Sequence, residues 1–303
     1  MKLKFNRPVG TPDPFIFEDN GRYYIYATAH EGVALYTADD IFGEWEFYGY
    51  VCKIEGCVQY WAPSVIKYEG KYYIYVSCQG EGFFQHLHVA MADSPEGPFV
   101  EPRMLYNRFS IDSHVVETES GLFLFYAENN ENCDIVGTRV FVDRLLDPYT
   151  PEHKSREIIV PTFHEENFNG RIINGKLWHT IEGPFWIYKD GWHYLMYSGG
   201  CYENDTYHIG YSTAQTDETD LTKVDFVKHT DNGSFAPLMI KNDFEEGVGH
   251  HSVICIDGQY YAVYHGRDYD KGDIVTSDYR TARICKLELR DGIIKAERYP
   301  DRV

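Results

Sequence analysis

Three carboxyl groups and one imidazole stand at the starts of similar segments, and together these side chains could do chemistry. Asp13, Asp112, Glu182 and His250 each begin a short strand-like run that leads into a turn and an aromatic run. If the side chains converge, the carboxyl groups cannot all ionise without cost, and at least one pKa must rise. Cleavage of a glycosidic bond needs one carboxylic acid to protonate the leaving oxygen and one carboxylate to activate water or attack the sugar carbon.

A single Asp before Pro or Ser is most often a turn or strand-start residue, so none of these positions is informative alone. Three carboxyl groups at one position of a repeat are harder to explain by turn chemistry. A third carboxyl can hold the acid in place and adjust its pKa. The set as a whole therefore indicates a catalytic site.

The repeat that carries these residues occurs five times and predicts β-hairpins. Its copies begin at Asp13, Ala62, Asp112, Glu182 and His250. Each copy reaches a tight turn, and the turns close on Gly21, Gly70, Gly121, Gly191 and Gly258. Glycine supplies the positive φ that such turns favour, and the flanking runs are rich in Tyr, Phe and Trp.

A further strand-like segment follows each hairpin, so every repeat has at least three strands. These segments are 33–37, 86–92, 137–142, 208–213 and 283–289. The copies begin about 50 to 70 residues apart, which is the scale of a propeller blade. We expect an all-β protein with a single domain over residues 1–303, a five-bladed β-propeller whose first strands line a central channel. Two β-sandwich domains are the alternative, but they would not explain one hairpin pattern throughout the chain.

Composition agrees with this class and limits the partners. Aromatic residues make up 16% of the chain, with 26 Tyr, and they favour strands. The formal net charge of -19 disfavours nucleic acid as a partner. No run of 18 apolar residues and no secretory leader is visible, so we expect no membrane association and a cytoplasmic location. Seven scattered Cys without a CxxC pair predict neither disulfides nor a zinc site.

At these residues the sequence resembles glycoside hydrolase family 43 over nearly its whole length. The resemblance rests on the stretches TPDPFIF, YWAPSV, SIDSHVV, TIEGPFW, GVGHHSV and YRTARICKLEL. It implies a five-bladed propeller with an inverting mechanism, in which Asp13 is the general base, Glu182 the general acid, and Asp112 the residue that raises the pKa of the acid and orients it. Inversion needs room for water, so we predict about 6.5 to 9.5 Å between the carboxyl groups of Asp13 and Glu182. Asp112 should lie closer to Glu182 than Asp13 does.

The resemblance also implies a cation near His250. Many family members hold a calcium ion in the channel through one His and a shell of waters, and His250 is preferred to His251 because it stands at the repeat start. Calcium prefers oxygen ligands, so one imidazole would make a weak, water-rich site. The alternative is a structural or substrate-contacting His. No organic cofactor is expected.

Three further residues are predicted to bind the substrate. Trp61 is placed to form a flat wall against a sugar, with a core Trp as the alternative. Arg280 matches an Arg of the family that reaches into the pocket, with a surface strand Arg as the alternative. Phe185 could line the pocket mouth.

The three carboxyl groups do not distinguish among the activities that the resemblance implies. Family β-xylosidases often carry a C-terminal β-sandwich that is not seen here, so we expect an α-L-arabinofuranosidase that releases terminal arabinose from hemicellulose-derived oligosaccharides. An exo-β-1,4-xylosidase, a dual activity and an endo-arabinanase are the alternatives. A carbohydrate-binding propeller without turnover is the alternative of a different class. The expected ligand is an arabinose- or xylose-containing oligosaccharide, and the oligomeric state stays open.

Overall fold

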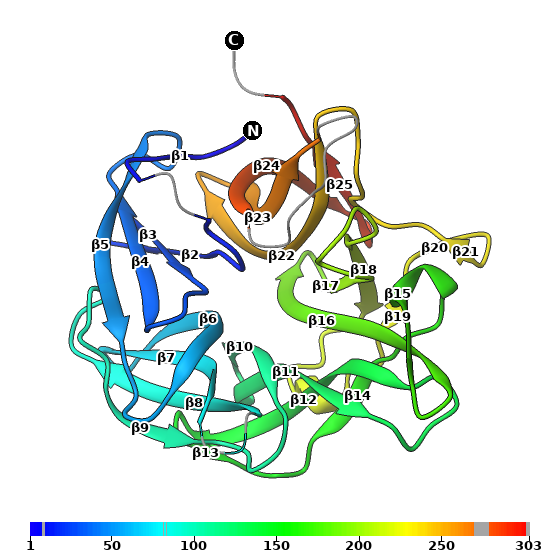
Figure 1. The fold of residues 1–303 in the computed structure, drawn as a ribbon, viewed down its shortest axis with the longest axis horizontal. Helices are drawn as coiled ribbons and strands as arrows, with labels where there is room; N and C mark the ends of the chain where they lie inside the picture. The colour runs from blue at the N-terminus through cyan, green and yellow to red at the C-terminus, as the bar shows by residue number, and fades with distance from the viewer. Residues whose placement is uncertain (8–9, 81, 83, 270–278, 301–303) are drawn as a thin grey trace.

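Five antiparallel blades surround a common centre, as the repeat predicts (Figure 1). A short parallel pairing joins the third and fourth blades into one sheet. The computed structural model describes residues 1–303 except 8–9, 81, 83, 270–278 and 301–303. The expected all-β class is confirmed, because the regular elements of the described residues are strands apart from two short 3-10 helices, η1 (His164–Glu166) and η2 (Leu221–Lys223). No helix in this part of the chain is long and apolar enough to cross a membrane.

Each blade is a meander whose first strand lies nearest the centre. The first blade is formed by β2 (Phe15–Asp19), β3 (Arg22–Ala27), β4 (Val33–Ala38) and β5 (Glu44–Cys52). The second is formed by β6 (Val58–Tyr68), β7 (Lys71–Gln79), β8 (Gln85–Ala92) and β9 (Val100–Met104). The third is formed by β10 (Ile111–Thr118), β11 (Gly121–Asn130) and β12 (Gly137–Asp147), with β13 (Thr150–Pro151) and β14 (Arg156–Ile159) paired to β12.

The last two blades have the same plan. The fourth is formed by β16 (Lys176–Lys189), β17 (Trp192–Gly199), β18 (His208–Gln215) and β19 (Val227–Lys228), with β15 (Asn167–Ile173) beside β16. The fifth is formed by β22 (Glu245–Ile256), β23 (Gln259–Asp268), β24 (Thr281–Arg290) and β25 (Ile293–Glu297). Between them lies the small hairpin of β20 (Thr230–Asp231) and β21 (Ser234–Phe235). The predicted third strands are therefore confirmed as parts of β4, β8, β12, β18 and β24.

The hairpin turns have the predicted chemistry. Positive φ at two successive residues defines the tight turn that matches strand twist, and it occurs at Asn20–Gly21, Glu69–Gly70, Asp190–Gly191 and Asp257–Gly258. In the third blade, Gly121 has φ 120°. The glycines predicted to close the turns are thus the residues that permit them.

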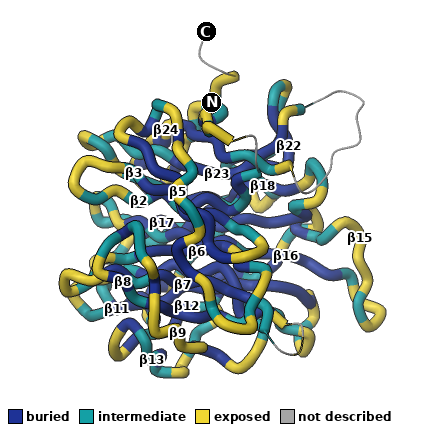
Figure 2. Tube along the Cα trace, turned by 60° about the vertical axis from the view of Figure 1, so that its left-hand side comes forward, coloured by how far each residue is buried: buried dark blue, intermediate teal, exposed yellow. Residues whose placement is uncertain are grey.

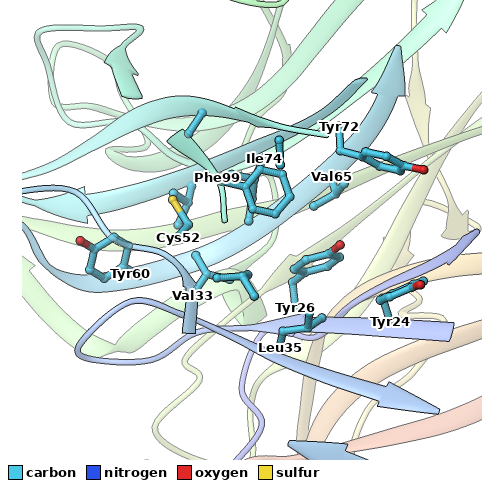
Figure 3. Close-up of a cluster of buried hydrophobic side chains, with 14 of the residues drawn as sticks. Tyr24, Tyr26, Val33, Leu35, Cys52, Tyr60, Val65, Tyr72, Ile74 and Phe99 are labelled. Carbon is cyan, nitrogen blue, oxygen red and sulfur yellow. The ribbon is translucent and has the colours of Figure 1, made fainter. Parts of the chain in front are cut away.

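Apolar side chains fill the space between each pair of neighbouring blades. Strand alternation sends Tyr24 and Tyr26 of β3 toward the second blade, while Ile25 and Ala27 face the fifth blade. The cluster between the first and second blades is drawn in Figure 3. Buried strands lie inside and exposed loops lie outside (Figure 2). Because separate clusters join all five neighbouring pairs, the last blade packs on the first.

The N-terminal segment also links the first and last blades. Strand β1 (Lys4–Phe5) runs parallel to β5 at the outer edge of the first blade. Just before it, the Leu3 N–H donates to the Ala282 carbonyl of β24 at 3.0 Å, and the Ile284 N–H donates to the Met1 carbonyl at 2.8 Å. These bonds hold the two ends of the ring together at the junction of the first and fifth blades.

One buried ion pair fixes the irregular segment before the fourth blade. Glu166 of η1 is fully buried, and its Oε1 lies 2.6 Å from Nζ of Lys228 on β19. Its Oε2 accepts the N–H groups of Thr162 at 2.6 Å and Phe163 at 3.0 Å. Every oxygen of this carboxylate therefore has a partner, as a buried charge requires.

Candidate active site

Every blade has a left-handed residue at an equivalent position, just before or within its inner strand. Asp13, Ala62, Asp112, Gly183 and His250 have φ between 45° and 60°. Non-glycine residues adopt this conformation at a cost, and it often marks functional positions. Register shifts beside these residues in β6, β10, β16 and β22 mark the same irregularity.

This ring corrects the predicted column of repeat starts at one position. Gly183, and not Glu182, is the fourth-blade equivalent of Asp13. The sequence alignment placed the carboxyl residues in one column because Glu182 directly precedes the equivalent glycine. A Cβ on Gly183 would lie 3.4 Å from Nδ1 of His250, so the glycine leaves room for that imidazole.

Two hollows lie at the ring, on different levels. A small cavity of about 10 Å³ is lined by left-handed residues and the residues that follow them, among them Pro14, Ser113 and His251. A cleft of about 750 Å³ is lined by Asp13, Asp112 and His250 together with residues that precede the ring, including Trp61 and Glu182. The three predicted carboxyl groups therefore meet at the wall of one cleft, which has the size of a site for a small organic ligand.

Asp13 is held as a carboxylate. Its Oδ1 lies 3.0 Å from the guanidinium of Arg280, and its Oδ2 accepts the Thr28 hydroxyl at 2.6 Å. Burial alone would raise the pKa of Asp13, but the charge of Arg280 and the neighbouring imidazoles outweigh burial and hold it well below the usual range. Asp13 is therefore ionised at neutral pH, as a general base must be.

The pKa values of Asp112 and Glu182 are raised, in contrast to that of Asp13. Burial, and then the neighbouring Glu182, raise the pKa of Asp112 well above its usual range, although the Gly183 N–H donates to its Oδ2 at 3.0 Å. Burial also raises the pKa of Glu182 to about 7, opposed by the hydroxyl of Tyr207 and helped by the charge of Asp13. The pair keeps at least one proton at neutral pH, which a general acid needs. Asp112 is not among the main causes for Glu182, so its role in raising that pKa stays a prediction.

His250 lies between the carboxyl groups. Its Nδ1 is 3.6 Å from Oδ1 of Asp13 and 3.8 Å from Oδ2 of Asp112, too far for hydrogen bonds. Burial lowers the pKa of His250, so the imidazole is neutral near pH 7.

The residues around His250 fit calcium poorly. Ligand atoms of Asp112, Glu182 and His250 lie within 4.8 Å of one another. Calcium takes six to eight oxygen ligands, whereas this group offers one nitrogen and two carboxyl groups that retain a proton. The predicted calcium ion stays a prediction, and no step of the chemistry below depends on it.

Trp61 and Arg280 both line the cleft, as predicted for substrate-binding residues. The side chain of Trp61 is 36% exposed, so it is not a core Trp. Arg280 contacts Asp13 and lies over the ring of Tyr202 at 4.8 Å. Sugar contacts by either residue remain predictions.

Phe185 lies elsewhere. It is buried and lines the small cavity below the ring, and it does not contribute to the cleft among the described residues. Its ring stacks on His114 at 4.0 Å. Since Phe185 follows the left-handed residue by two positions, its side chain turns into the channel. The position does not favour the predicted role at the pocket mouth.

The separation of Asp13 and Glu182, predicted at about 6.5 to 9.5 Å, also stays a prediction. The proximity of Asp112 to Glu182 rests on their ligand atoms, which lie within 4.8 Å. Sequence reasoning missed four residues at the site: Thr28, Tyr202, Tyr207 and His265. Thr28, Tyr202 and Tyr207 lie after hairpins or in loops, and His265 lies on β23. All four are outside the repeat starts, and no motif in one sequence separates them from other structural residues of the same types.

Comparison with known proteins places this geometry in a family. The sequence model described as Glycosyl hydrolases family 43 matches residues 5–294. A solved structure described as a thermostable family-43 glycoside hydrolase superposes with a TM-score of 0.81 and 27% identity, covering 99% of this chain and 98% of that one.

Two curated relatives have names that describe activities. The chain is 28% identical over 330 residues to a xylosidase/arabinosidase from Bacteroides ovatus, covering 91% of each chain. It is 25% identical over 249 residues to alpha-L-arabinofuranosidase 43 from Humicola insolens, covering 78% of this chain. The match spans 49% of that relative, so the chain corresponds to about half of its length.

Proposed function

The chain belongs to family 43 of the glycosyl hydrolases, and from this membership we propose that it hydrolyses arabinose- or xylose-containing oligosaccharides with inversion of configuration. Release of terminal α-L-arabinofuranosyl residues is the proposed main activity. The names of the two curated relatives support arabinose and xylose as the sugars.

The opposite protonation of two carboxyl groups at one cleft carries the proposal. The pKa of Asp13 is held well below its usual range, while that of Glu182 is raised to about 7. A protein that only binds sugar hydroxyls has no need for one ionised and one protonated carboxyl group. Pairs of titratable groups with pKa values pushed apart are the mark of acid and base roles.

The proposed reaction uses the two groups in a single displacement. The ionised Asp13 accepts a proton from a water molecule, and the water oxygen bonds to the anomeric carbon. The bond from this carbon to the leaving oxygen breaks, and that oxygen takes the proton of Glu182. The products are a sugar of inverted configuration and a shortened oligosaccharide, with Asp13 protonated and Glu182 ionised until solvent restores them.

The cleft supports an oligosaccharide as the substrate. Its volume of about 750 Å³ lies well above the lower limit of about 300 Å³ for small-molecule sites. Trp61 and Tyr202 offer aromatic surface, and Gln59 offers amide groups for hydroxyls. Exo-β-1,4-xylosidase, dual activity and endo-arabinanase remain the alternatives, because aromatic and amide groups of this kind suit all these sugars.

The test is hydrolysis of p-nitrophenyl α-L-arabinofuranoside and p-nitrophenyl β-D-xylopyranoside by the wild type, Asp13→Asn and Glu182→Gln. We expect release by the wild type and a loss of at least about 100-fold in kcat for Asp13→Asn. Asp39→Asn is the matched control, because the Asp39 side chain is 95% exposed. The rate ratio of the two glycosides ranks the sugars.

Proton NMR of the first-formed sugar tests inversion separately. A first product with retained anomeric configuration would reject the single displacement. If neither glycoside nor a linear arabinan is cleaved while arabino- and xylo-oligosaccharides bind, the chain is a binding propeller and the proposed hydrolysis is wrong.

A further inference from the structure

A buried tyrosine holds the proposed general acid. The Tyr207 hydroxyl donates a hydrogen bond to Oε1 of Glu182 at 2.6 Å. Tyr207 directly precedes β18 and is 1% exposed, whereas Glu182 is half-buried and lines the cleft. A short bond to a carboxyl group that lines the cleft restricts the directions in which the acid can point.

Two neighbouring residues of the fifth blade, His265 and Gly249, lie against the ring of Tyr207. The Tyr207 ring stacks on the imidazole of His265, with centroids 5.6 Å apart and planes 9° apart. A Cβ at Gly249 would lie 2.0 Å from the Tyr207 ring, which is closer than two such atoms can approach. Gly249 directly precedes His250 in the ring, so the absence of a side chain there lets Tyr207 enter the site. Tyr207 thus occupies a socket that leaves it little freedom.

His265 connects this socket to the proposed general base. Nδ1 of His265 lies 3.1 Å from the backbone nitrogen of Asp13 and 3.1 Å from Oδ1 of the same residue. In one tautomer Nδ1 accepts the backbone N–H, and in the other it donates to the carboxylate. His265 therefore makes a hydrogen bond to Asp13 in either tautomer. This bond fixes the left-handed Asp13.

The loop before Tyr207 is anchored from the fifth blade. The guanidinium of Arg267 on β23 donates to the carbonyl of Tyr202 at 2.8 Å and to the carbonyl of Asn204 at 2.7 Å. Arg267 is buried, and Glu246 lies 3.6 Å from its Nε. The same loop thereby supplies Tyr202 to the cleft and delivers Tyr207 to the acid.

We propose that Tyr207 and His265 are positioning residues that hold the general acid and the general base of the cleft through one stacked pair. Neither residue touches the sugar in this proposal, and it rests on the proposed function. Tyr207 acts on the acid Glu182, and His265 acts on the base Asp13. The two arms have different consequences, because only the acid interacts with the leaving oxygen.

The experiment compares two glycosides of the preferred sugar, one with a poor leaving group and one with the activated 2,4-dinitrophenyl group. The phenylalanine variant Tyr207→Phe removes one hydroxyl and keeps the stacked ring. We expect kcat for the poor leaving group to fall about 10- to 100-fold, and kcat for the activated one to fall less than about threefold. KM should change little. A merely structural loss would lower both rates alike.

The control is Tyr211→Phe on β18, the strand that Tyr207 directly precedes. Tyr211 is equally buried, belongs to the apolar cluster between the fourth and fifth blades, and stacks on His229. It should keep the wild-type rates for both substrates. His265→Phe tests the other arm: it retains a ring for stacking but removes the hydrogen-bond partner of Asp13. We expect it to lower kcat for both leaving groups by a similar factor of about 10.

Equal rates for Tyr207→Phe and the wild type on the poor leaving group would overturn the acid arm. Equal rates for His265→Phe and the wild type would overturn the base arm. A wild type without hydrolytic activity would instead reject the proposed function, so the two failures are distinguishable. Circular dichroism melts confirm that each variant is folded before its rates are compared.

Discussion

Substitution of Arg280 by Gln should make an acid limb appear in the pH–rate profile. The guanidinium lies 3.0 Å from Oδ1 of Asp13, and both side chains are largely buried. It is the leading cause that holds the pKa of Asp13 below its usual range against the effect of burial. Without this guanidinium, the effect of burial should raise the pKa of Asp13.

The size of the expected change in the pKa of Asp13 follows from the interaction between its carboxylate and the Arg280 guanidinium. Two unit charges about 4 Å apart interact by about 4 kcal/mol at an effective dielectric constant of about 20, and one pKa unit corresponds to about 1.4 kcal/mol. An opposite charge at this range lowers the pKa of an Asp by about 1 to 3. Removal of Arg280 should therefore raise the pKa of Asp13 by about 1 to 3 from its position in the wild type.

The sign follows from the role of the base. Asp13 works as a carboxylate, so activity falls as pH drops through its pKa. In the wild type this fall lies below the ordinary Asp value of 3.8, and in Arg280→Gln it should lie about one to three pH units higher. The assay is kcat/KM from pH 3.5 to 8 with the preferred p-nitrophenyl glycoside, together with kcat to separate weaker sugar binding.

Two controls accompany this measurement. Arg280→Lys keeps the positive charge, so its acid limb should stay near that of the wild type even if KM rises. Arg290→Gln changes a guanidinium whose side chain is 79% exposed, and it should leave the profile unchanged. If the acid limbs of Arg280→Gln and the wild type coincide, then the charge of Arg280 does not hold Asp13 in its ionised state, and the reasoning is refuted.

Two more predictions concern the acid and the stability of the fold. The wild-type kcat/KM should fall as pH rises through about 7, because Glu182 then loses the proton that the leaving oxygen needs; a flat profile from pH 6 to 9 would contradict this assignment. Lys228→Met should lower the free energy of unfolding in urea by about 3 to 5 kcal/mol, because it leaves the Glu166 carboxylate buried without its cation. The double variant with Glu166→Gln should recover much of this loss, whereas Lys241→Met, which breaks an exposed pair with Asp205, should cost at most about 1 kcal/mol.

The sequence predicts the blades well because their signals are local. Each hairpin combines a turn glycine with alternating apolar residues, and both features are visible within about 17 residues of sequence. The outer strands β5 and β9 are harder to predict, since β9 is exposed along its whole length and has no apolar pattern. Their pairing depends on the third strand of the same blade, which no local pattern describes.

The site is predictable only where it coincides with the repeat. Asp13, Asp112 and His250 stand at repeat starts, and the structure brings them to one cleft. Tyr207 and His265 are set by packing between the fourth and fifth blades, over a sequence distance that a single chain does not reveal. Among the described residues, Phe185 lines the small cavity and not the cleft, because its two-residue offset from the left-handed Gly183 decides which hollow its side chain enters.

Glu182 lies one residue before the left-handed position that Asp13 occupies in the first blade, and this offset gives the two carboxyl groups different partners. Asp13 is the left-handed residue itself and faces Arg280 across the junction of the first and fifth blades. Glu182 precedes the left-handed Gly183, so its side chain meets the phenol of Tyr207 and no cation at hydrogen-bond distance among the described residues. Because of this offset of one residue, the carboxyl group of Glu182 contacts a hydroxyl where that of Asp13 contacts a guanidinium. Burial raises the pKa of both carboxyl groups, and the adjacent charge of Arg280 outweighs burial at Asp13 but not at Glu182.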